Sequence, residues 1–438
     1  MSNQTKLSLP VLTSLVMGNM IGTGIFVLPA SLAAFGSISI FSWIFTGMGS
    51  LFLALTFASL NSKIPKSGGP YAYCKEGYGD FIGFLVAYTY WISVWVATAA
   101  IAVASIAYLN VILGVPTVNP LLAFAIEVAA VWIFTLINIR GIREAGVVQF
   151  ILTALKILPL LLITSVGLLK MNVHHFSQFN LMHQSNLSSF TGAATLTFWA
   201  FIGLETATIP AENARSSRDV YRATVFGTLL AALIYLISTI AIMGLIAPVD
   251  LKNSTSPFSD AGHLLFGCHT AIIIAICVMI AGFGTLNVCT MVQGQVPYAA
   301  ARDGLFPTRF AGLSRFGTPK YSLIVSAILV SLLLILTVNA TLLKQFNMLA
   351  LLASLATLVT YFICAMAEII LLMRKSAEFN RYSLIKSLVI ASLAGAYSIW
   401  MIVGAGEDTV FYGILLVFSS FPAYAWLVSK QRKLSAVA

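Results

Sequence analysis

Three glycines interrupt a long apolar stretch near the start of the chain, in the run Gly18-Asn19-Met20-Ile21-Gly22-Thr23-Gly24-Ile25-Phe26. Each glycine weakens a helix by roughly 1 kcal/mol relative to alanine. Unpaired amides persist at bilayer depth only beside protein or a watery cavity, so a break here predicts a cavity. The freed amides of Thr23, Gly24 and Ile25 would lie at the positive end of a half-helix, where they suit a carboxylate. A packing surface of small residues four apart is the alternative interpretation.

A second apolar segment carries a glycine and an acid, in Trp199-Ala200-Phe201-Ile202-Gly203-Leu204-Glu205, and Pro210 follows it. Trp199, Ile202 and Glu205 lie three residues apart, a spacing that lets them face one cavity. A carboxylate beside an aromatic ring suits an ammonium or guanidinium, through charge pairing and cation–π attraction. The same acid could instead carry protons. The structural alternative is a glutamate paired with the backbone of a neighbouring helix or with a lysine.

The composition places these residues in an integral membrane protein. Apolar residues make up 59% of the chain and charged residues 9%, with a mean hydropathy of +0.95, which is outside the range of soluble domains. Segments of about 20 apolar residues can cross a bilayer. We predict about twelve such spans, near 11–34, 38–60, 81–112, 120–139, 147–170, 190–211, 222–246, 270–300, 322–340, 346–373, 384–404 and 409–429.

The net charge of +10 is explained by topology rather than by a nucleic acid partner. With a cytoplasmic N-terminus, the outside loops hold only Lys170, Lys252 and Lys344 of the 24 Lys and Arg residues. Lys156 falls within a span, and the other 20 lie in the inside segments. This bias follows the positive-inside rule, so we expect a multi-pass protein of the cell (inner) membrane with both termini in the cytoplasm.

The cysteines and histidines form no pattern typical of a metal site or a disulfide framework. The five cysteines, at 74, 268, 277, 289 and 364, are scattered and contain no CxxC pair. His174, His175 and His183 share one predicted outside loop, where histidines are usually solvated. We therefore expect no metal and no cofactor. The first apolar span is too long for a cleavable signal, and we interpret it as the first membrane helix.

Four ionisable residues lie inside predicted spans, where each is costly and calls for a reason. Besides Glu205, these include Lys156, which lies in the middle of the fifth span. Lys156 is a candidate proton switch or a fixed substitute for a coupling sodium ion. The alternative interpretation is that its side chain snorkels to the lipid headgroups. Glu127 in the fourth span is also deep and could pair with Lys156. Glu368 is nearer the end of the tenth span, where a structural role is expected.

The two interrupted segments belong to the first and the sixth predicted spans. Interrupted helices at matching places in two halves of a chain are typical of an inverted-repeat transporter, whose site lies near the membrane midplane. The identity between the halves is too weak to establish the repeat directly. We expect a transport core of ten helices over residues 1–380 and a final helix pair with a cytoplasmic tail over 381–438.

Four motifs resemble the amino acid–polyamine–organocation superfamily: GNMIGTGIFVLPASLAAFG at 18–36, SGGPYAY at 67–73, FWAFIGLE at 198–205 and AAARDGLFP at 299–307. They are most similar to its basic amino acid/polyamine antiporters, the arginine:agmatine, lysine:cadaverine and ornithine:putrescine exchangers. The resemblance covers nearly the whole chain. It implies an all-α LeuT-like fold of twelve helices, a five-plus-five inverted repeat with broken helices one and six, and a substrate held between them.

The resemblance also implies roles for individual residues. The carboxylate of the substrate would be bound by Thr23 and Gly24, next to a wall formed by Asn19, Met20, Ile21 and Gly22. In the second break, Trp199 would gate the substrate, Ile202 would offer a backbone carbonyl, and Glu205 would serve cationic substrates or proton coupling. Tyr90 and Tyr361 match tyrosines near the pathway, with packing as the alternative for each.

The sequence departs from the arginine exchanger at positions that flank its substrate. An Asn, a Trp and a Ser of that exchanger are replaced by Thr98, Cys289 and Ala353, which removes a polar contact and an aromatic partner for a guanidinium. Lys156 replaces a small residue and is similar to a lysine of sodium-independent, proton-coupled members. These departures favour a proton-coupled symporter of neutral amino acids as the alternative to exchange.

The primary hypothesis is a secondary active transporter of amino acids, a cationic amino acid/polyamine antiporter that works by alternating access. We expect an amino acid or amine as substrate, the lipid bilayer as surroundings, and protons and a second copy of the chain as further candidate partners. A channel would need rings of charge or carbonyls. A membrane enzyme would need a nucleophile with a base or a metal cluster, and the sequence offers neither.

Overall fold

The computed structural model describes residues 7–65, 68–115, 119–141, 145–208, 214–374 and 380–435, and within them the chain is all-helical with no β-strand. The long helices are α3 (Ile38–Lys63), α5 (Asp80–Ile106), α7 (Pro120–Arg140), α8 (Ala145–Lys170), α10 (Ser217–Leu245), α13 (Cys268–Arg302), α14 (Lys320–Thr337), α15 (Leu342–Arg374) and α16 (Arg381–Val403). The shorter ones are α1 (Leu9–Met20), α2 (Gly24–Ala33), α4 (Pro70–Tyr78), α6 (Leu109–Leu113), α9 (Asn186–Phe198), α11 (Pro248–Leu251), α12 (Pro257–Phe266), α17 (Glu407–Phe418) and α18 (Ser420–Ser435). Single 3₁₀ turns cover Val173–Phe176, Trp199–Phe201, Thr206–Thr208 and Thr308–Ala311.

The described helices confirm a multi-pass membrane protein. Ten of them are long and apolar enough to cross a bilayer, and eleven if α1 and α2 form one bent span. The fifth predicted span, 147–170, lies within α8, whose 26 residues extend about 39 Å, more than the hydrocarbon core of about 30 Å. The ten helices, the α1–α2 pair and α8 together overlap all of the predicted spans. The division of the chain at residue 380 stays a prediction.

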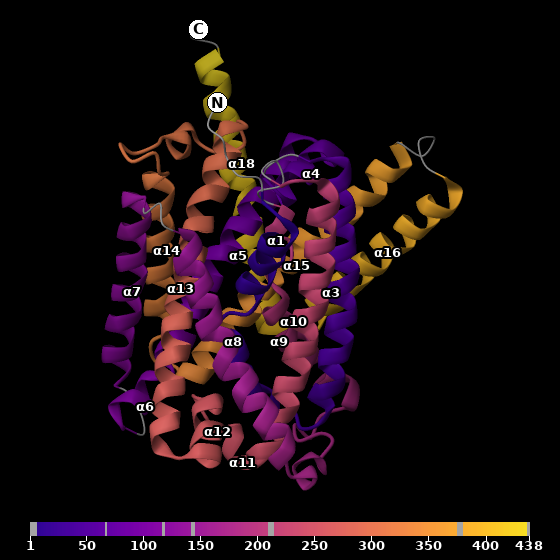
Figure 1. Ribbon diagram of the computed structural model, residues 1–438. Helices are drawn as coiled ribbons and strands as arrows, with labels where there is room; N and C mark the ends of the chain where they lie inside the picture. The colour runs from indigo at the N-terminus through magenta and orange to yellow at the C-terminus, as the bar shows by residue number, and fades with distance from the viewer. Residues whose placement is uncertain are drawn as a thin grey trace.

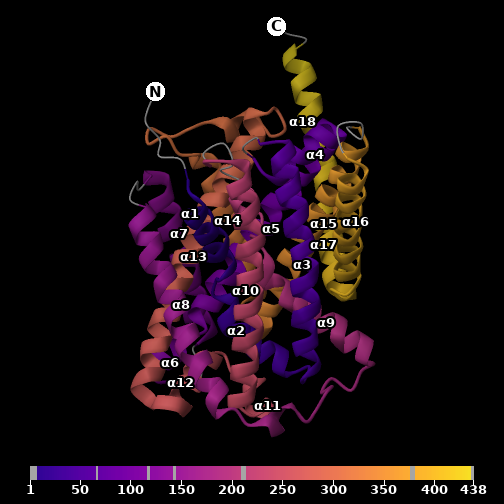
Figure 2. The same ribbon diagram turned by 45° about the vertical axis from the view of Figure 1, so that its right-hand side comes forward.

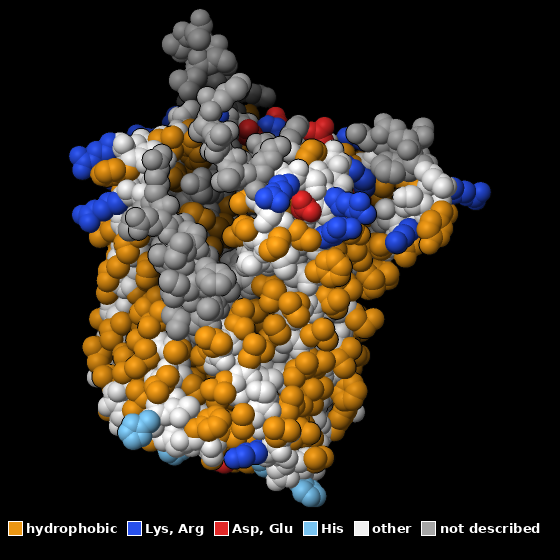
Figure 3. All heavy atoms as spheres, viewed as in Figure 1, with side chains coloured by type: hydrophobic (Ala, Val, Ile, Leu, Met, Phe, Trp, Pro, Cys, Tyr) orange, Lys and Arg blue, Asp and Glu red, His pale blue; other side chains and the backbone are white. Residues whose placement is uncertain are grey.

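The charged side chains separate the two ends of the bundle. The start of α1 and the end of α18 lie at the same end of the bundle, which we call the terminal end (Figure 1 and Figure 2). In the face shown in Figure 3, Lys and Arg gather at the terminal end, and apolar side chains cover the middle. Helices α6, α11 and α12 lie at the opposite end (Figure 1). This distribution agrees with the asymmetry expected from the loops.

The first predicted break is present between α1 and α2, which are bent by 44° relative to each other. The helix stops at Met20 because the backbone of Ile21 leaves the helical region, with ψ at 76°. A tight bond from the amide of Gly22 to the carbonyl of Met20, at 2.8 Å, closes the turn. The chain then re-enters a helix at Gly24. The first predicted span, in which the glycines predicted a break, is thus divided into α1 and α2.

The second break follows α9, which ends at Phe198 and continues as the 3₁₀ turn Trp199–Phe201. Ile202 is extended, with ψ at 131°, and Gly203 has a φ of +99°, a conformation that residues with a side chain rarely adopt. A further 3₁₀ turn covers Thr206–Thr208. Pro210, which the sequence places after this break, lies outside the described residues.

Candidate functional site

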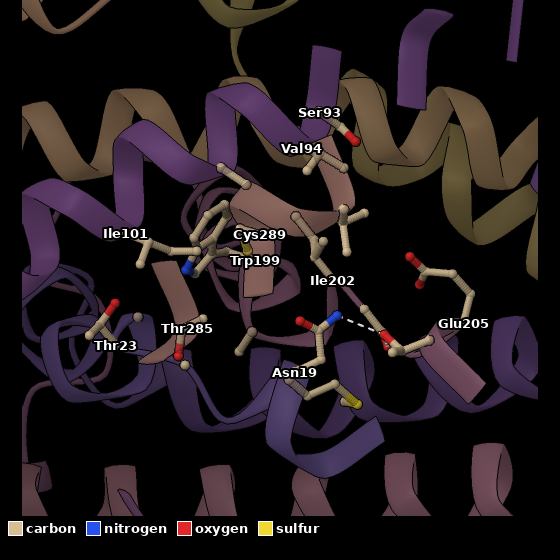
Figure 4. A pocket seen from close by; sticks show the side chains of 18 of the residues that line it. Asn19, Thr23, Ser93, Val94, Ile101, Trp199, Ile202, Glu205, Thr285 and Cys289 are labelled. Atoms are coloured by element: carbon tan, nitrogen blue, oxygen red, sulfur yellow. Dashed lines mark hydrogen bonds between the residues drawn. The ribbon is translucent and has the colours of Figure 1, made fainter. Parts of the chain in front are cut away.

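A pocket lies where the two breaks meet, and α5 and α13 complete its wall. Its volume is about 70 Å³. Figure 4 shows Glu205 at one end of it and Thr23 at the other, with Trp199, Ile202 and Asn19 between them. The lining residues are Asn19, Met20, Gly22, Thr23, Gly24, Ile25, Tyr90, Ser93, Val94, Ala97, Ile101, Trp199, Ala200, Ile202, Gly203, Glu205, Thr206, Thr285, Cys289 and Val292.

Asn19 connects the two breaks. Its side-chain amide donates to the hydroxyl of Thr206 at 2.7 Å, the bond that is dashed in Figure 4. The same hydroxyl donates to the carbonyl of Gly203 at 2.5 Å. A Cβ on Gly203 would lie 2.3 Å from the Asn19 amide nitrogen, so only glycine leaves room for this contact. The end of α1 is thereby fixed against the irregular segment that follows α9.

One end of the pocket offers unpaired hydrogen-bond donors. The backbone amides of Thr23, Gly24 and Ile25, at the start of α2, have no hydrogen-bond acceptor among the described residues. The hydroxyl of Thr23 is fully buried and is also without a partner there. First-turn amides and the helix dipole together favour an anionic group. This end can therefore receive a carboxylate.

Trp199 covers that donor end. A Cβ on Gly24 would lie 2.1 Å from its indole nitrogen, so the ring lies directly on the glycine backbone. Phe346 of α15 packs edge-on against the same ring, with the centroids 5.9 Å apart. The indole is thus held between the first break and α15, at the place where it closes the pocket.

The other end of the pocket is acidic. Glu205 is fully buried, and its carboxylate accepts hydrogen bonds from two tyrosines of different helices. The hydroxyl of Tyr90, on α5, donates to one oxygen at 2.5 Å, and the hydroxyl of Tyr361, on α15, donates to the other. A carboxylate has about four acceptor positions, so both oxygens retain capacity for a further donor. Among the described residues, neither a lysine nor the backbone of another helix bonds to this carboxylate, which differs from the structural alternative that the sequence left open.

Lys156 is buried next to the first break rather than extended to the headgroups. Its ammonium donates to the carbonyl of Gly18 at 3.2 Å and to the hydroxyl of Thr285 at 2.6 Å. The lysine therefore links α8 to the end of α1 and to α13. It does not contact Glu127, which lines a separate cavity. Glu368 forms an ion pair with Lys63 and accepts from Ser59 at 2.6 Å, as a structural residue would.

The structure brings most of the predicted site residues to this pocket. Asn19, Met20, Gly22, Thr23, Gly24, Tyr90, Trp199, Ile202, Glu205 and Cys289 line it. Ile21, Thr98, Ala353, Tyr361 and Lys156 are buried but are not part of the lining. Of these, Tyr361 and Lys156 contact lining residues. The hydroxyl of Thr98, on α5, instead donates to the side chain of Gln293, on α13, at 3.1 Å.

Sequence reasoning named Tyr90 of α5 and Cys289 of α13 but missed most of the wall that these two helices contribute. The missed lining residues include Ser93, Val94, Ala97, Ile101 and Thr285. Helix α5 is buried on nearly all sides, so no stripe of residues marks the face that lines the pocket. The hydroxyl of Thr285 could have been sought as a partner for Lys156, because a buried ammonium needs acceptors.

The arrangement is suited to binding rather than to covalent chemistry. It combines unpaired amides at one end, an acid at the other and an aromatic cover between them. Among the residues that the structure describes, no three His, Cys, Asp or Glu side chains are grouped so as to hold a metal ion. A ligand with both a carboxylate and a cationic group would complement the two ends of this pocket.

Comparison with known proteins agrees with this geometry. The profile of a family described as amino acid permease matches residues 7–429. The chain is 30% identical to the putrescine transporter PotE of Escherichia coli K12, with 99% of this chain and 98% of that protein covered. It is also 30% identical to an arginine/agmatine antiporter of Chlamydia abortus and 28% identical to an arginine/ornithine antiporter of Pseudomonas aeruginosa, in both cases over 94% of this chain and 88% of the relative. The chain therefore belongs to the amino acid permease family of the amino acid–polyamine–organocation superfamily, a family of membrane transporters and not of enzymes.

Proposed function

We propose that this protein exchanges a cationic amino acid for its decarboxylated amine across the membrane. The single observation that carries this proposal is the buried carboxylate of Glu205, which lies at one end of the pocket between the two breaks. A buried acid with free acceptor capacity is suited to an ammonium or guanidinium group. The names of the relatives, which include a putrescine transporter and two arginine antiporters, support the same substrate class.

In this proposal the two ends of the pocket recognise the two ends of the substrate. The amides of Gly24 and Ile25 and the hydroxyl of Thr23 bind the carboxylate. The cationic side chain lies beneath Trp199, past Ile202, and points toward Glu205. An amine product keeps the contact with Glu205 and lacks the one with α2, so the same site accepts both exchange partners. Asn19 and Met20 form the adjacent wall.

Transport requires the pocket to change its size. The pocket's volume of about 70 Å³ is well below the roughly 300–1,000 Å³ that is typical of small-molecule sites, so an amino acid needs more room than this conformation offers. Trp199 is the element that must move first, since its indole covers the donor end. Displacement of the broken helices then opens one side of the pocket or the other, as alternating access requires.

We further propose a LeuT-like arrangement in the cell membrane, with the terminal end in the cytoplasm. The breaks in the first and the sixth spans support an inverted repeat of five plus five helices. The gathering of Lys and Arg at the terminal end supports the orientation. Lys156, bonded at the first break, would take the place of a coupling sodium ion.

Counterflow in proteoliposomes tests the proposed exchange. Vesicles containing the purified protein are loaded with unlabelled putrescine and diluted into labelled L-ornithine, L-arginine or L-alanine, with and without a pH gradient. We expect rapid uptake of the cationic amino acids only when the lumen holds an amine or cationic amino acid. Uptake of L-alanine that depends on the pH gradient and not on the internal amine would contradict exchange and favour the symporter of neutral amino acids.

A further inference from the structure

A second cavity lies at the opposite end of the bundle. Its volume is about 610 Å³, within the range of roughly 300–1,000 Å³ that is typical of small-molecule sites. It is formed by α6, the start of α7, the segment after α11, the connection between α14 and α15, and the start of α15. The pocket between the breaks and this cavity have no lining residue in common. The second cavity is therefore a separate space.

Glu127 supplies a carboxylate within this cavity. The residue is 1% exposed, and its Oε1 atom has no hydrogen-bond partner among the described residues. It follows the exposed start of α7 at Pro120 by seven residues, about two helical turns or roughly 10 Å. A buried carboxylate without a partner is costly. Because Glu127 lies in a cavity wall, we infer that a hydrogen-bond donor of a bound ligand pairs with its carboxylate.

Two other lining residues of this cavity are also suited to a cation. Asn110 donates its amide to Thr255 at 3.1 Å, which leaves its Oδ1 atom buried and without a partner in the described part of the chain. Phe124, one turn before Glu127 on α7, adds an aromatic ring to the same wall. Two unpaired acceptor oxygens beside an aromatic ring are typical of a site for an ammonium or guanidinium group.

Two lysines of the same cavity carry the opposite charge. Lys252 follows α11 and Lys344 lies in the first turn of α15; both line the cavity and both are exposed. Neither has an acidic partner within the described ranges. Exposed ammonium groups attract a carboxylate and repel a second cation. The cavity therefore presents an acceptor in its buried wall and positive charges at its exposed side.

We propose that this cavity is a second binding site, specific for amino acids with a cationic side chain. The side-chain cation binds Glu127 and Asn110, and the carboxylate faces Lys252 and Lys344. The roughly 10 Å along α7 between its exposed start at Pro120 and the buried Glu127 suits a ligand whose two charged groups are separated by several methylene groups. A diamine of the same length meets two lysines where the amino acid has its carboxylate, so the site discriminates against it. This assignment depends on the cavity alone and not on the function of the pocket between the breaks.

Equilibrium dialysis of the purified full-length protein tests this assignment, with L-ornithine and putrescine as a matched pair that differs by one carboxylate. Glu127→Gln keeps the shape of the side chain and removes its charge. We expect the variant to bind one ornithine fewer per chain than the unaltered protein, with putrescine binding unchanged. Because this readout is a difference in stoichiometry, it holds whether or not the pocket between the breaks also binds ornithine.

The lysines provide a second test that does not depend on a buried substitution. Lys252→Ala with Lys344→Ala should weaken ornithine binding at this site about tenfold and leave putrescine unaffected. Lys170→Ala, which alters an exposed lysine outside the cavity lining, and Glu407→Gln, which alters an exposed acid, are the matched controls. Equal ornithine stoichiometry in the unaltered protein and in Glu127→Gln, or equal affinity in the double lysine variant, would overturn the proposal.

Discussion

Gly203 lies directly against the side chain of Asn19, so the break after α9 contacts the break after α1. A Cβ on Gly203 would be 2.3 Å from the Asn19 amide nitrogen, and the same amide donates to Thr206 at 2.7 Å. The two interruptions are therefore one structural unit, although Asn19 and Gly203 are 184 positions apart along the chain. The pocket exists because these two irregular segments meet.

Gly203→Ala should lower the stability of the protein for two reasons. Its φ of +99° strains a residue with a side chain, which costs about 1–3 kcal/mol, and the new Cβ collides with Asn19. Asn19→Ala should relieve the collision, because the Asn19 Cβ is 3.4 Å away, at ordinary contact distance. The free energy of unfolding should thus fall less in the double variant than the sum of its decreases in the two single variants. Thermal unfolding of all three proteins measures these decreases. Additive losses would contradict a direct contact.

Gly24→Ala should disturb the closure of the pocket. The new Cβ would lie 2.1 Å from the indole nitrogen of Trp199, and Phe346 limits the space into which the ring can retreat. Overpacking of this kind costs about 1–3 kcal/mol, and we expect the rate of uptake in proteoliposomes to fall at least about tenfold. Gly312→Ala is the control, since its nearest neighbouring atom would be 3.4 Å from the new Cβ. Equal uptake by both variants would show that the position of Trp199 does not depend on Gly24.

Thr285→Val should weaken the tether of the first break. Valine has a similar shape but cannot accept from Lys156, whose ammonium would retain only the carbonyl of Gly18 as an acceptor within the described part of the chain. Loss of an acceptor for a buried charged donor costs about 1–3 kcal/mol. Thr285→Ser keeps the hydroxyl and should unfold at a temperature closer to that of the unaltered protein. The opposite order of the two unfolding temperatures would contradict this role for Thr285.

Tyr361→Phe should lower stability, because it removes one of the two hydroxyls that donate to the buried Glu205. Hydrogen bonds to charged groups contribute about 1.5–3 kcal/mol. The double variant, Tyr361→Phe with Tyr90→Phe, should lose more stability than either single variant. Tyr382→Phe, at a position that is 76% exposed, is the control and should leave the unfolding temperature unchanged. A Tyr361→Phe protein as stable as this control would exclude the hydrogen bond.

The membrane spans and both breaks could be predicted from the sequence because their causes are local. Apolar runs report a lipid environment directly, and Gly22, Gly24 and Gly203 mark places where a helix is weak. Trp199, Ile202 and Glu205 do line one pocket, but not through the helical spacing that predicted it. The α-helix ends at Phe198, and the irregular path after it brings the three together.

The walls of the pocket could not be predicted in the same way. Ser93, Ala97 and Ile101 belong to a helix that is buried on nearly all sides, so their orientation depends on how α5 is rotated against distant helices. The same rotation directs Thr98 toward Gln293 instead of into the pocket. Likewise, the tyrosine partners of Glu205 come from α5 and α15, far apart in the sequence. Contacts of this kind depend on tertiary packing and leave no local pattern.

Recognition of the substrate cation by Glu205 is tested most directly by ornithine–putrescine exchange in proteoliposomes containing Glu205→Gln. The substitution keeps the shape of the side chain and removes the charge that the cation requires. We predict that exchange falls to the level of protein-free vesicles while the variant remains folded, and that Glu407→Gln, at an exposed position, exchanges normally. Exchange by Glu205→Gln at the unaltered rate would contradict the account.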